Sequence, residues 1–281
     1  MSRQNFNERF MFSHTILNQI YIDGESLKRY LELLKVLVMR NLKVRYRGSF
    51  LGVYWSLLNP LMMTVVYTAI FGTTFAEYYD NSTLNYVLAA FTGLVVTNFY
   101  SASTSQALAS IVGNGSLLNK IKLPLSVFPT SMIAANSFQF LVGTFPLLSI
   151  ISLLTSHNIL NILGLLLITL DLGLVCMGIG FFVSTLYIYF RDLPYFYEIV
   201  CFMVWISSPV FYPAAIVPDN IKTILLLNPL TSIIEALREL SLSGSFPSTL
   251  TLGKAFLSGF LAMSLGWFFF QSQKDNMMDL V

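Results

Sequence analysis

Six long apolar stretches, separated by short polar breaks, are the dominant pattern of this chain. A bilayer core of about 30 Å is crossed by about 20 helical residues, because each residue rises only about 1.5 Å. The six stretches meet or approach that length and cover residues 51–75, 84–108, 126–154, 162–187, 199–217 and 255–270. The pattern therefore predicts an all-α polytopic membrane protein with six transmembrane helices.

Composition supports this prediction. Of the 281 residues, 55% are hydrophobic and 11% are charged, and that charged share is under half of the average for soluble domains, which is about 25%. A soluble globule of this length could not bury so much apolar surface. The net charge of +2 is too small to indicate a nucleic-acid partner.

The distribution of basic residues predicts the orientation. With a cytoplasmic N-terminus and six crossings, only Lys222, Arg238 and Lys254 fall on the outer side. The inner side then receives all the others, namely Arg3, Arg9, Lys28, Arg29, Lys35, Arg40, Lys43, Arg45, Arg47, Lys120, Lys122, Arg191 and Lys274. This asymmetry follows the positive-inside rule, so we expect both termini in the cytoplasm.

Residues 27–47 form a separate region between a polar tail, residues 1–26, and the first apolar stretch. On a helical wheel the leucines of this region share one side and the basic residues share the other. The pattern predicts an amphipathic helix at the cytoplasmic membrane surface. Two roles stay open: the helix could anchor the chain in anionic headgroups, or it could also dock a soluble partner.

Two further segments interrupt the apolar pattern. Residues 113–124 contain glycines, a short basic amphipathic run and a proline that begins the third stretch, which together predict a short cytoplasmic helix. Residues 213–250 follow a proline-broken aromatic cluster and include a capped amphipathic helix, residues 228–238, that is too short to span a bilayer. We expect a re-entrant or interfacial hairpin on the outer side, although a surface helix that shields the bundle would fit as well.

Motifs of catalysis are missing from the sequence. It contains no G-x-x-x-x-G-K-[ST] phosphate loop, no H-E-x-x-H and no G-x-S-x-G, so we expect no catalytic residue, metal or cofactor in this chain. Asp171 is the one acidic residue inside a predicted stretch, at a cost of about 2.5 to 3.5 kcal/mol for a helix centre. It could serve a coupling ion or form a structural hydrogen bond. Energy for uphill transport would have to come from another subunit.

Several motifs resemble one family. They are residues 40–49 with Leu51, Gly52 and Trp55, residues 119–124, residues 189–192, residues 208–212 and residues 227–230. In this order, and at these positions relative to the six predicted spans, the motifs resemble those of the membrane-spanning permease subunits of bacterial ABC-type polysaccharide exporters. Those exporters move O-antigen, capsule or teichoic-acid chains. The resemblance implies an inner-membrane homodimer that exports a lipid-linked polysaccharide, bound to two copies of a separate ATPase subunit that holds ATP and Mg.

The resemblance also implies three groups of functional residues. The ATPase-coupling group is Arg40, Lys43, Arg45, Arg47, Asn114, Gly115, Leu118, Lys120 and Lys122. The channel-lining group is Tyr67, Phe71, Phe75, Tyr86, Phe91, Phe99 and Tyr100. The outer-gate group is Pro209, Phe211, Tyr212, Pro213, Asn228, Pro229, Glu235 and Arg238.

Three alternatives to this function remain. Related ABC exporter permeases carry a drug, haem or a small lipid with the same architecture. An ion-coupled carrier that uses Asp171 would need no ATPase, and a membrane scaffold would need no cargo. Aromatic residues are also common at membrane interfaces in general, which weakens the channel assignment of any single ring.

Overall fold

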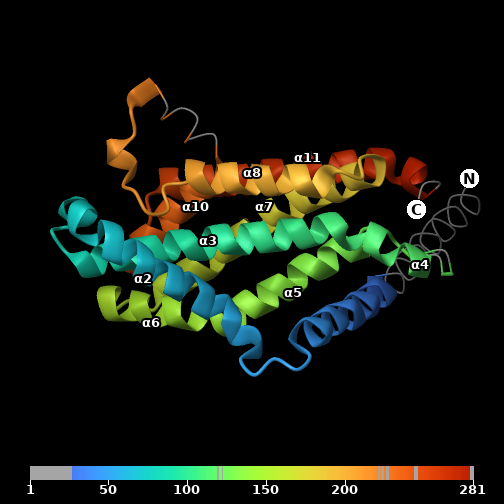
Figure 1. Cartoon of the computed structure of the whole chain (residues 1–281), viewed down its shortest axis with the longest axis horizontal. Helices are drawn as coiled ribbons and strands as arrows, with labels where there is room; N and C mark the ends of the chain where they lie inside the picture. Colours follow the sequence, from blue (N-terminus) through green and yellow to red (C-terminus); the bar gives the residue numbers. More distant parts are fainter. Residues whose placement is uncertain are drawn as a thin grey trace, which may run out of the picture.

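A computed structural model describes residues 27–118, 120–121, 123–220, 222, 225, 228–243 and 246–278. All regular secondary structure in these ranges is helical, which confirms the predicted all-α class. The long helices run side by side along the longest axis of the molecule (Figure 1). The predicted tail, residues 1–26, lies outside the described residues.

The first described helix covers residues 27–46. The main helices that follow are α2 (Trp55–Phe75), α3 (Thr83–Ser110), α5 (Val127–Gly143), α6 (Phe145–Ser156), α7 (Leu160–Tyr189), α8 (Leu193–Ser207), α10 (Pro229–Arg238) and α11 (Thr249–Met278). Short helical turns join them: η1 (Gly52–Tyr54), η2 (Ala76–Tyr78), η3 (Val112–Asn114), α4 (Gly115–Leu118), η4 (Ala214–Ile216) and the π-helical turn η5 (Glu239–Ser243).

By length and composition, four helices of the described residues could each cross a membrane, or five if α5 and α6 form one bent span. Of the six predicted spans, one is bent within its length and two begin or end at other residues. The stretch 126–154 is broken at Thr144, where α5 and α6 meet at an angle of 45°. Pro146 lacks the amide that would continue the helix, and Gly143 directly precedes the break.

The stretch predicted for residues 199–217 is also displaced. Its helix, α8, begins at Leu193, with Pro194 in the first turn, and ends at Ser207. Ser208 is extended, with ψ at 140°, because the following Pro209 disfavours the helical conformation of the residue before it. Residues 208–217 therefore leave the helix. The last helix, α11, is longer than the predicted 255–270 because it continues at both ends.

The helices differ strongly in burial. Within the apolar window of α3, 72% of the residues are buried inside the protein, against 11% for the window that contains α2. Helix α3 is therefore the central helix, and most of α2 faces outward (Figure 1). The start of the helix of residues 27–46, α4 and the end of α11 lie at one end of the molecule, and the helix runs from there toward the middle (Figure 1). The turns η2 and η4 lie at the opposite end.

Helices α7 and α11 cross in backbone contact. A Cβ atom at Gly178 of α7 would collide with the carbonyl group of Ala262, and one at Gly266 of α11 would collide with the carbonyl group of Gly178. Small residues allow such close approach, which is how many membrane helices associate. Gly178 of α7 and Gly266 of α11 thus serve helix packing.

Gly178→Ala is expected to destabilise the protein by about 1 to 3 kcal/mol, because the added methyl group has no room at the crossing. Gly173→Ala on the same helix is the matched control: a Cβ there meets nothing within 4 Å, and alanine favours a helix by about 1 kcal/mol. Thermal unfolding of the purified protein in detergent measures both. Equal melting temperatures for the two variants would contradict the backbone contact.

Candidate functional site

The helix of residues 27–46 packs its apolar side on protein. Leu37 is buried in a cluster with Ile111, Leu125 and Phe128, and Tyr30 packs against the same cluster. Leu27 and Leu31, nearer the start of the helix, stay exposed. The helix is therefore held against the segment that joins α3 to α5, and its basic side faces outward.

Polar contacts fix this helix to its neighbours. Arg40 donates a hydrogen bond from Nη2 to Oδ1 of Asn114, at 2.9 Å, and Asn114 donates from Nδ2 to the carbonyl oxygen of Ser110, at 2.7 Å. Next to them, Asn41 donates from Nδ2 to Oγ of Ser131 in α5, at 3.1 Å. We call Arg40, Asn41, Asn114 and Ser131 the inner clasp. It joins the helix of residues 27–46, which we call the basic helix, to η3 and to α5.

The other residues of the predicted coupling group lie around the inner clasp. Lys43, Arg47 and Lys120 are exposed. Gly115 begins α4 and Leu118 ends it, and the side chain of Leu118 packs against the cluster that contains Leu37. Lys122 lies outside the described residues. Exposed positive charges thus lie along the helix of residues 27–46 and next to α4.

Arg45 points the other way, toward the long helices. Its Nη1 donates to Oδ1 of Asn136 at 2.9 Å and to Oε1 of Gln139 at 2.7 Å, and its Nη2 donates to Oε1 of Gln106. Asn136 also donates from Nδ2 to Oε1 of Gln106, at 3.1 Å. We call Gln106, Asn136 and Gln139 the amide cluster. The guanidinium of Arg45 thereby links the basic helix to α3 and α5.

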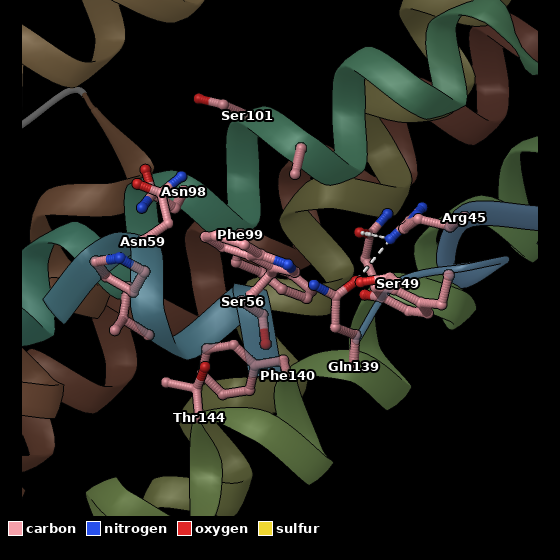
Figure 2. A pocket seen from close by; sticks show the side chains of 16 residues that line it. Arg45, Ser49, Ser56, Asn59, Asn98, Phe99, Ser101, Gln139, Phe140 and Thr144 are labelled. Carbon is pink, nitrogen blue, oxygen red and sulfur yellow. Dashed lines mark hydrogen bonds between the residues drawn. The ribbon is translucent and has the colours of Figure 1, made fainter. Parts of the chain in front are cut away.

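A cavity of about 650 Å³ opens beside Arg45, between the start of α2, α3 and α5. Figure 2 shows the side chains that line it, with Arg45 near one end and Asn59 and Asn98 at the other. Hydroxyl and amide groups alternate with rings on its walls, chiefly Ser49, Ser56, Asn59, Asn98, Ser101 and Gln139 among the polar residues and Trp55, Phe99 and Phe140 among the aromatic ones. We call this space the inner cavity.

At the opposite end, Arg238 of α10 holds the broken end of α8. Its guanidinium donates to the carbonyl oxygens of Ala89 at 2.9 Å, Pro209 at 2.6 Å and Val210 at 2.8 Å. The carbonyl groups of Pro209 and Val210 lie past the end of α8 and have no helical partner, and the arginine supplies one. Gly93 of α3 allows the contact, since a Cβ there would lie 2.8 Å from Cα of Val210.

Asn228 makes the second attachment of this outer segment. Its Oδ1 caps α10 by accepting from the amide of Leu230 at 3.0 Å, and its Nδ2 donates to Oγ of Ser208 at 2.9 Å. Pro229 is the first residue of α10, a position that suits proline. Glu235 of α10 is half-buried and lies three residues before Arg238.

An aromatic row joins α2 to this outer segment. The rings of Tyr67 and Phe211 stack with centroids 4.7 Å apart, Tyr67 lies 6.3 Å from Phe71, and Phe71 lies 5.8 Å from Phe75. Trp205 of α8 packs on Phe211 at 5.2 Å. We call these five residues the aromatic row. Trp205 was not among the predicted rings, because nothing in the spacing along α8 singled it out.

The remaining predicted rings and gate residues lie close by or within the core. Tyr86 packs on Phe75 and donates its hydroxyl to the carbonyl oxygen of Phe211 at 3.0 Å. Phe91 and Tyr100 are buried in the core around α3, and Phe99 is buried with one side on the inner cavity. Tyr212 donates its hydroxyl to the carbonyl oxygen of Ile206 at 3.0 Å, and Pro213 is buried.

Asp171 is fully buried between α7 and α11. Its carboxyl group lies against Gly259 of α11, and among the described residues neither of its oxygens has a hydrogen-bond partner. It does not line the inner cavity. A search of the described part of the chain finds no group of three residues able to hold a metal ion.

The amide cluster and the polar wall of the inner cavity were not predicted. Asn98 and Gln106 lie in α3 and Asn136 and Gln139 lie in α5, inside stretches that were read only as apolar. The signal was present, because amide side chains inside membrane helices are costly unless they have partners. Which helices they share could not be read from one sequence.

Known proteins match this chain along most of its length. Residues 32–242 match the family described as ABC-2 type transporter. The sequence is 29% identical over 216 residues to an O-antigen export system permease protein, RfbA, of Klebsiella pneumoniae, which covers 76% of this chain and 82% of that protein. It is 30% identical over 216 residues to the RfbA protein of Myxococcus xanthus, covering 74% of this chain and 79% of that protein.

A more distant relative covers more of the sequence. The polysialic acid transport protein KpsM of Escherichia coli is 21% identical over 249 residues, which is 87% of this chain and 94% of that protein. The family match includes the basic helix from residue 32, the inner clasp, the inner cavity and Arg238. The chain therefore belongs to the ABC-2 type transporter family.

Proposed function

We propose that this chain is the permease subunit of an ATP-driven exporter that moves a lipid-linked polysaccharide across the bacterial inner membrane. The relatives named for O-antigen export and polysialic acid transport support the cargo class. The family supports a transport subunit that works with an ATPase. The chain would act as a homodimer bound to two copies of that ATPase.

The inner clasp is the observation that carries the proposal. A separate ATPase can act on this permease only through groups exposed at its cytoplasmic end. Lys120 is exposed next to α4, and Lys43 and Arg47 are exposed on the helix of residues 27–46. The bond between Arg40 and Asn114 joins that helix to η3, directly before α4. A push on either element would therefore move both.

A displacement of the inner clasp would be transmitted to the walls of the inner cavity, where we expect the transport path to begin. Asn41 connects the basic helix to α5, and Arg45 connects it to α3 and α5, whose side chains form walls of the inner cavity. Hydroxyl, amide and aromatic groups suit a sugar, because they bind its hydroxyls and pack on its C–H faces. Export would begin in this cavity.

The outer segment would form the exit. Helix α10 is too short to span a bilayer, and α8 with 15 residues extends only about 22 Å. We assign α8 together with the residues after it to the fifth crossing and α10 to a re-entrant helix, which gives six crossings in all. The aromatic row, held by Arg238 and Tyr86, would line the exit and gate it.

Polysaccharide is favoured over the other cargoes by the relatives and by the polar inner cavity. A drug, haem or small-lipid exporter would have the same clasp, but an apolar cargo would not need the amide and hydroxyl groups of the cavity wall. Asp171 packs on Gly259 and does not line the inner cavity, so a coupling ion bound to it would lie outside the transport path that we propose.

Lys120→Glu is expected to weaken association with the ATPase, because it reverses a charge at the proposed contact. We expect less ATPase to copurify and the ATPase activity of the complex to fall, with the loss growing as salt is lowered, since screening then decreases. Lys274→Glu is the matched control, an equal charge change on an exposed lysine of α11 at the same end of the molecule. ATP hydrolysis by the permease alone, or unchanged association in Lys120→Glu, would contradict the proposal.

Arg238→Gln is expected to loosen the exit. Charge-assisted hydrogen bonds contribute about 1.5 to 3 kcal/mol each, and the variant removes the arginine donor from the carbonyl oxygens of Pro209 and Val210. A cysteine placed at Phe211, in a chain whose Cys176 and Cys201 are replaced by alanine, should then react faster with a maleimide added from outside. Arg238→Lys should restore part of the protection.

The control for the exit is Lys254→Gln, which removes an exposed positive charge at the start of α11. It should leave the labelling rate of the cysteine at position 211 unchanged. Equal labelling rates in Arg238→Gln and the parent chain would show that this arginine does not hold the outer segment.

A further inference from the structure

The inner cavity holds a positive charge that no acidic group balances. Arg45 is the charged residue among its lining, which contains no aspartate or glutamate among the residues that the structure describes. The groups that accept its hydrogen bonds are the neutral amide oxygens of Asn136, Gln139 and Gln106. Neutral acceptors orient a guanidinium and satisfy its N–H groups, but they leave its full charge in place.

The unbalanced charge of Arg45 favours an anionic ligand. Arg45 is only half-exposed, and it lies where the basic helix meets the apolar spans, so it is partly removed from bulk water. A desolvated charge is destabilising unless it is paired. Guanidinium groups bind phosphate oxygens with two parallel hydrogen bonds, which makes phosphate the anion that this geometry suits best.

The rest of the cavity adds a second kind of contact. Asn59 and Asn98 lie at the end away from Arg45 (Figure 2), and neither side chain makes a hydrogen bond within the described residues. Trp55, Ser49 and Asn59 are exposed, so the cavity opens outward. A ligand with a phosphate at Arg45 could therefore place a polar, hydroxyl-bearing part against the two asparagines.

We propose that the inner cavity binds a phosphate or diphosphate ester through Arg45, with its adjoining polar group on the asparagine end. This inference rests on the proposed function and names the part of the cargo that the permease holds first: the phosphate link between the lipid and the glycan. A soluble phosphate compound would present the same anionic chemistry, and the experiment below separates the two sources.

The position of Arg45 gives the site a second property. Arg45 belongs to the helix of residues 27–46. Five residues earlier on this helix, Arg40 donates a hydrogen bond to Asn114, the last residue of η3. An anion at Arg45 competes with the amide cluster for its N–H groups. Occupancy of the cavity would therefore change the hold on the basic helix, and the ATPase attached at that end would respond to bound cargo.

The test measures binding to the purified permease with three probes: farnesyl diphosphate, inorganic pyrophosphate and farnesol. Trp55 lines the cavity, so its fluorescence reports binding in a chain that carries Trp205→Phe and Trp267→Phe. Thermal stabilisation of the unaltered chain gives a second measurement. We expect farnesyl diphosphate to bind and farnesol to fail. Tighter binding of farnesyl diphosphate than of pyrophosphate identifies a lipid-linked ligand, and equal binding identifies the phosphate group alone as the determinant.

Arg45→Gln should weaken binding of farnesyl diphosphate by at least about tenfold, the loss that corresponds to one charge-assisted hydrogen bond. Arg45→Lys keeps the charge and the fold, and should bind with intermediate affinity. The matched control is Lys28→Gln, which removes one exposed positive charge from the same helix, far from the cavity. Equal affinity for farnesol, no binding of any probe, or an equal loss in Lys28→Gln would overturn the site.

The response of the ATPase to a bound ligand is tested on the complex of permease and ATPase. Farnesyl diphosphate should change the rate of ATP hydrolysis in the parent complex and in Lys28→Gln, but not in Arg45→Gln. If farnesyl diphosphate bound but left the rate of ATP hydrolysis in the parent complex unchanged, the link between occupancy of the inner cavity and the ATPase would be overturned. Because the binding measurement needs neither ATPase nor glycan, its failure is distinct from failure of the export function, which the copurification of ATPase tests.

Discussion

The attachment of one basic helix to a bundle of apolar helices is the constraint on which this structure depends. Leu37 is the one buried leucine of the helix of residues 27–46, and Leu33 and Leu34 pack in part against the same cluster. Polar contacts add to this packing, those of the inner clasp and those of Arg45 with the amide cluster. In surroundings of low polarity such contacts are strong when complete and costly when broken. They therefore fix the helix in one orientation.

The two ends of the molecule use the same chemistry for different purposes. At the inner end, Arg45 binds side-chain amides of separate helices, so that a displacement of its own helix is passed to α3 and α5. At the outer end, Arg238 binds backbone carbonyls where a helix has been broken by proline. The first arginine connects separate helices, and the second binds an irregular segment that follows a helix end. Both lie in positions where a lysine could not make the same set of contacts.

Much of the fold could be predicted from the sequence, because long apolar stretches have few alternatives to the membrane helix. Proline and capping signals placed α10 correctly, with Asn228 as its N-cap. The errors arose where apolar composition hid a break, at Thr144 and at Ser208, since hydropathy reports length and not straightness. The candidate site was less predictable. Basic residues indicated the inner end, but the partners of Arg45 lie 61 to 94 positions away in sequence, and only the packing of helices brings them together.

The central claim is that the helix of residues 27–46 and the segment of residues 113–124, which contains Asn114, move as one body when the ATPase hydrolyses ATP. It is tested most directly by joining them with a short bifunctional maleimide between cysteines placed at Arg40 and Asn114, in a chain without Cys176 and Cys201, and by measuring export per ATP hydrolysed in the assembled complex. The account predicts that the cross-linked complex exports as well as the uncross-linked one or better, because the link replaces a bond that is never broken. Loss of export on cross-linking, with ATP hydrolysis intact, would show that the two elements must separate and would contradict it.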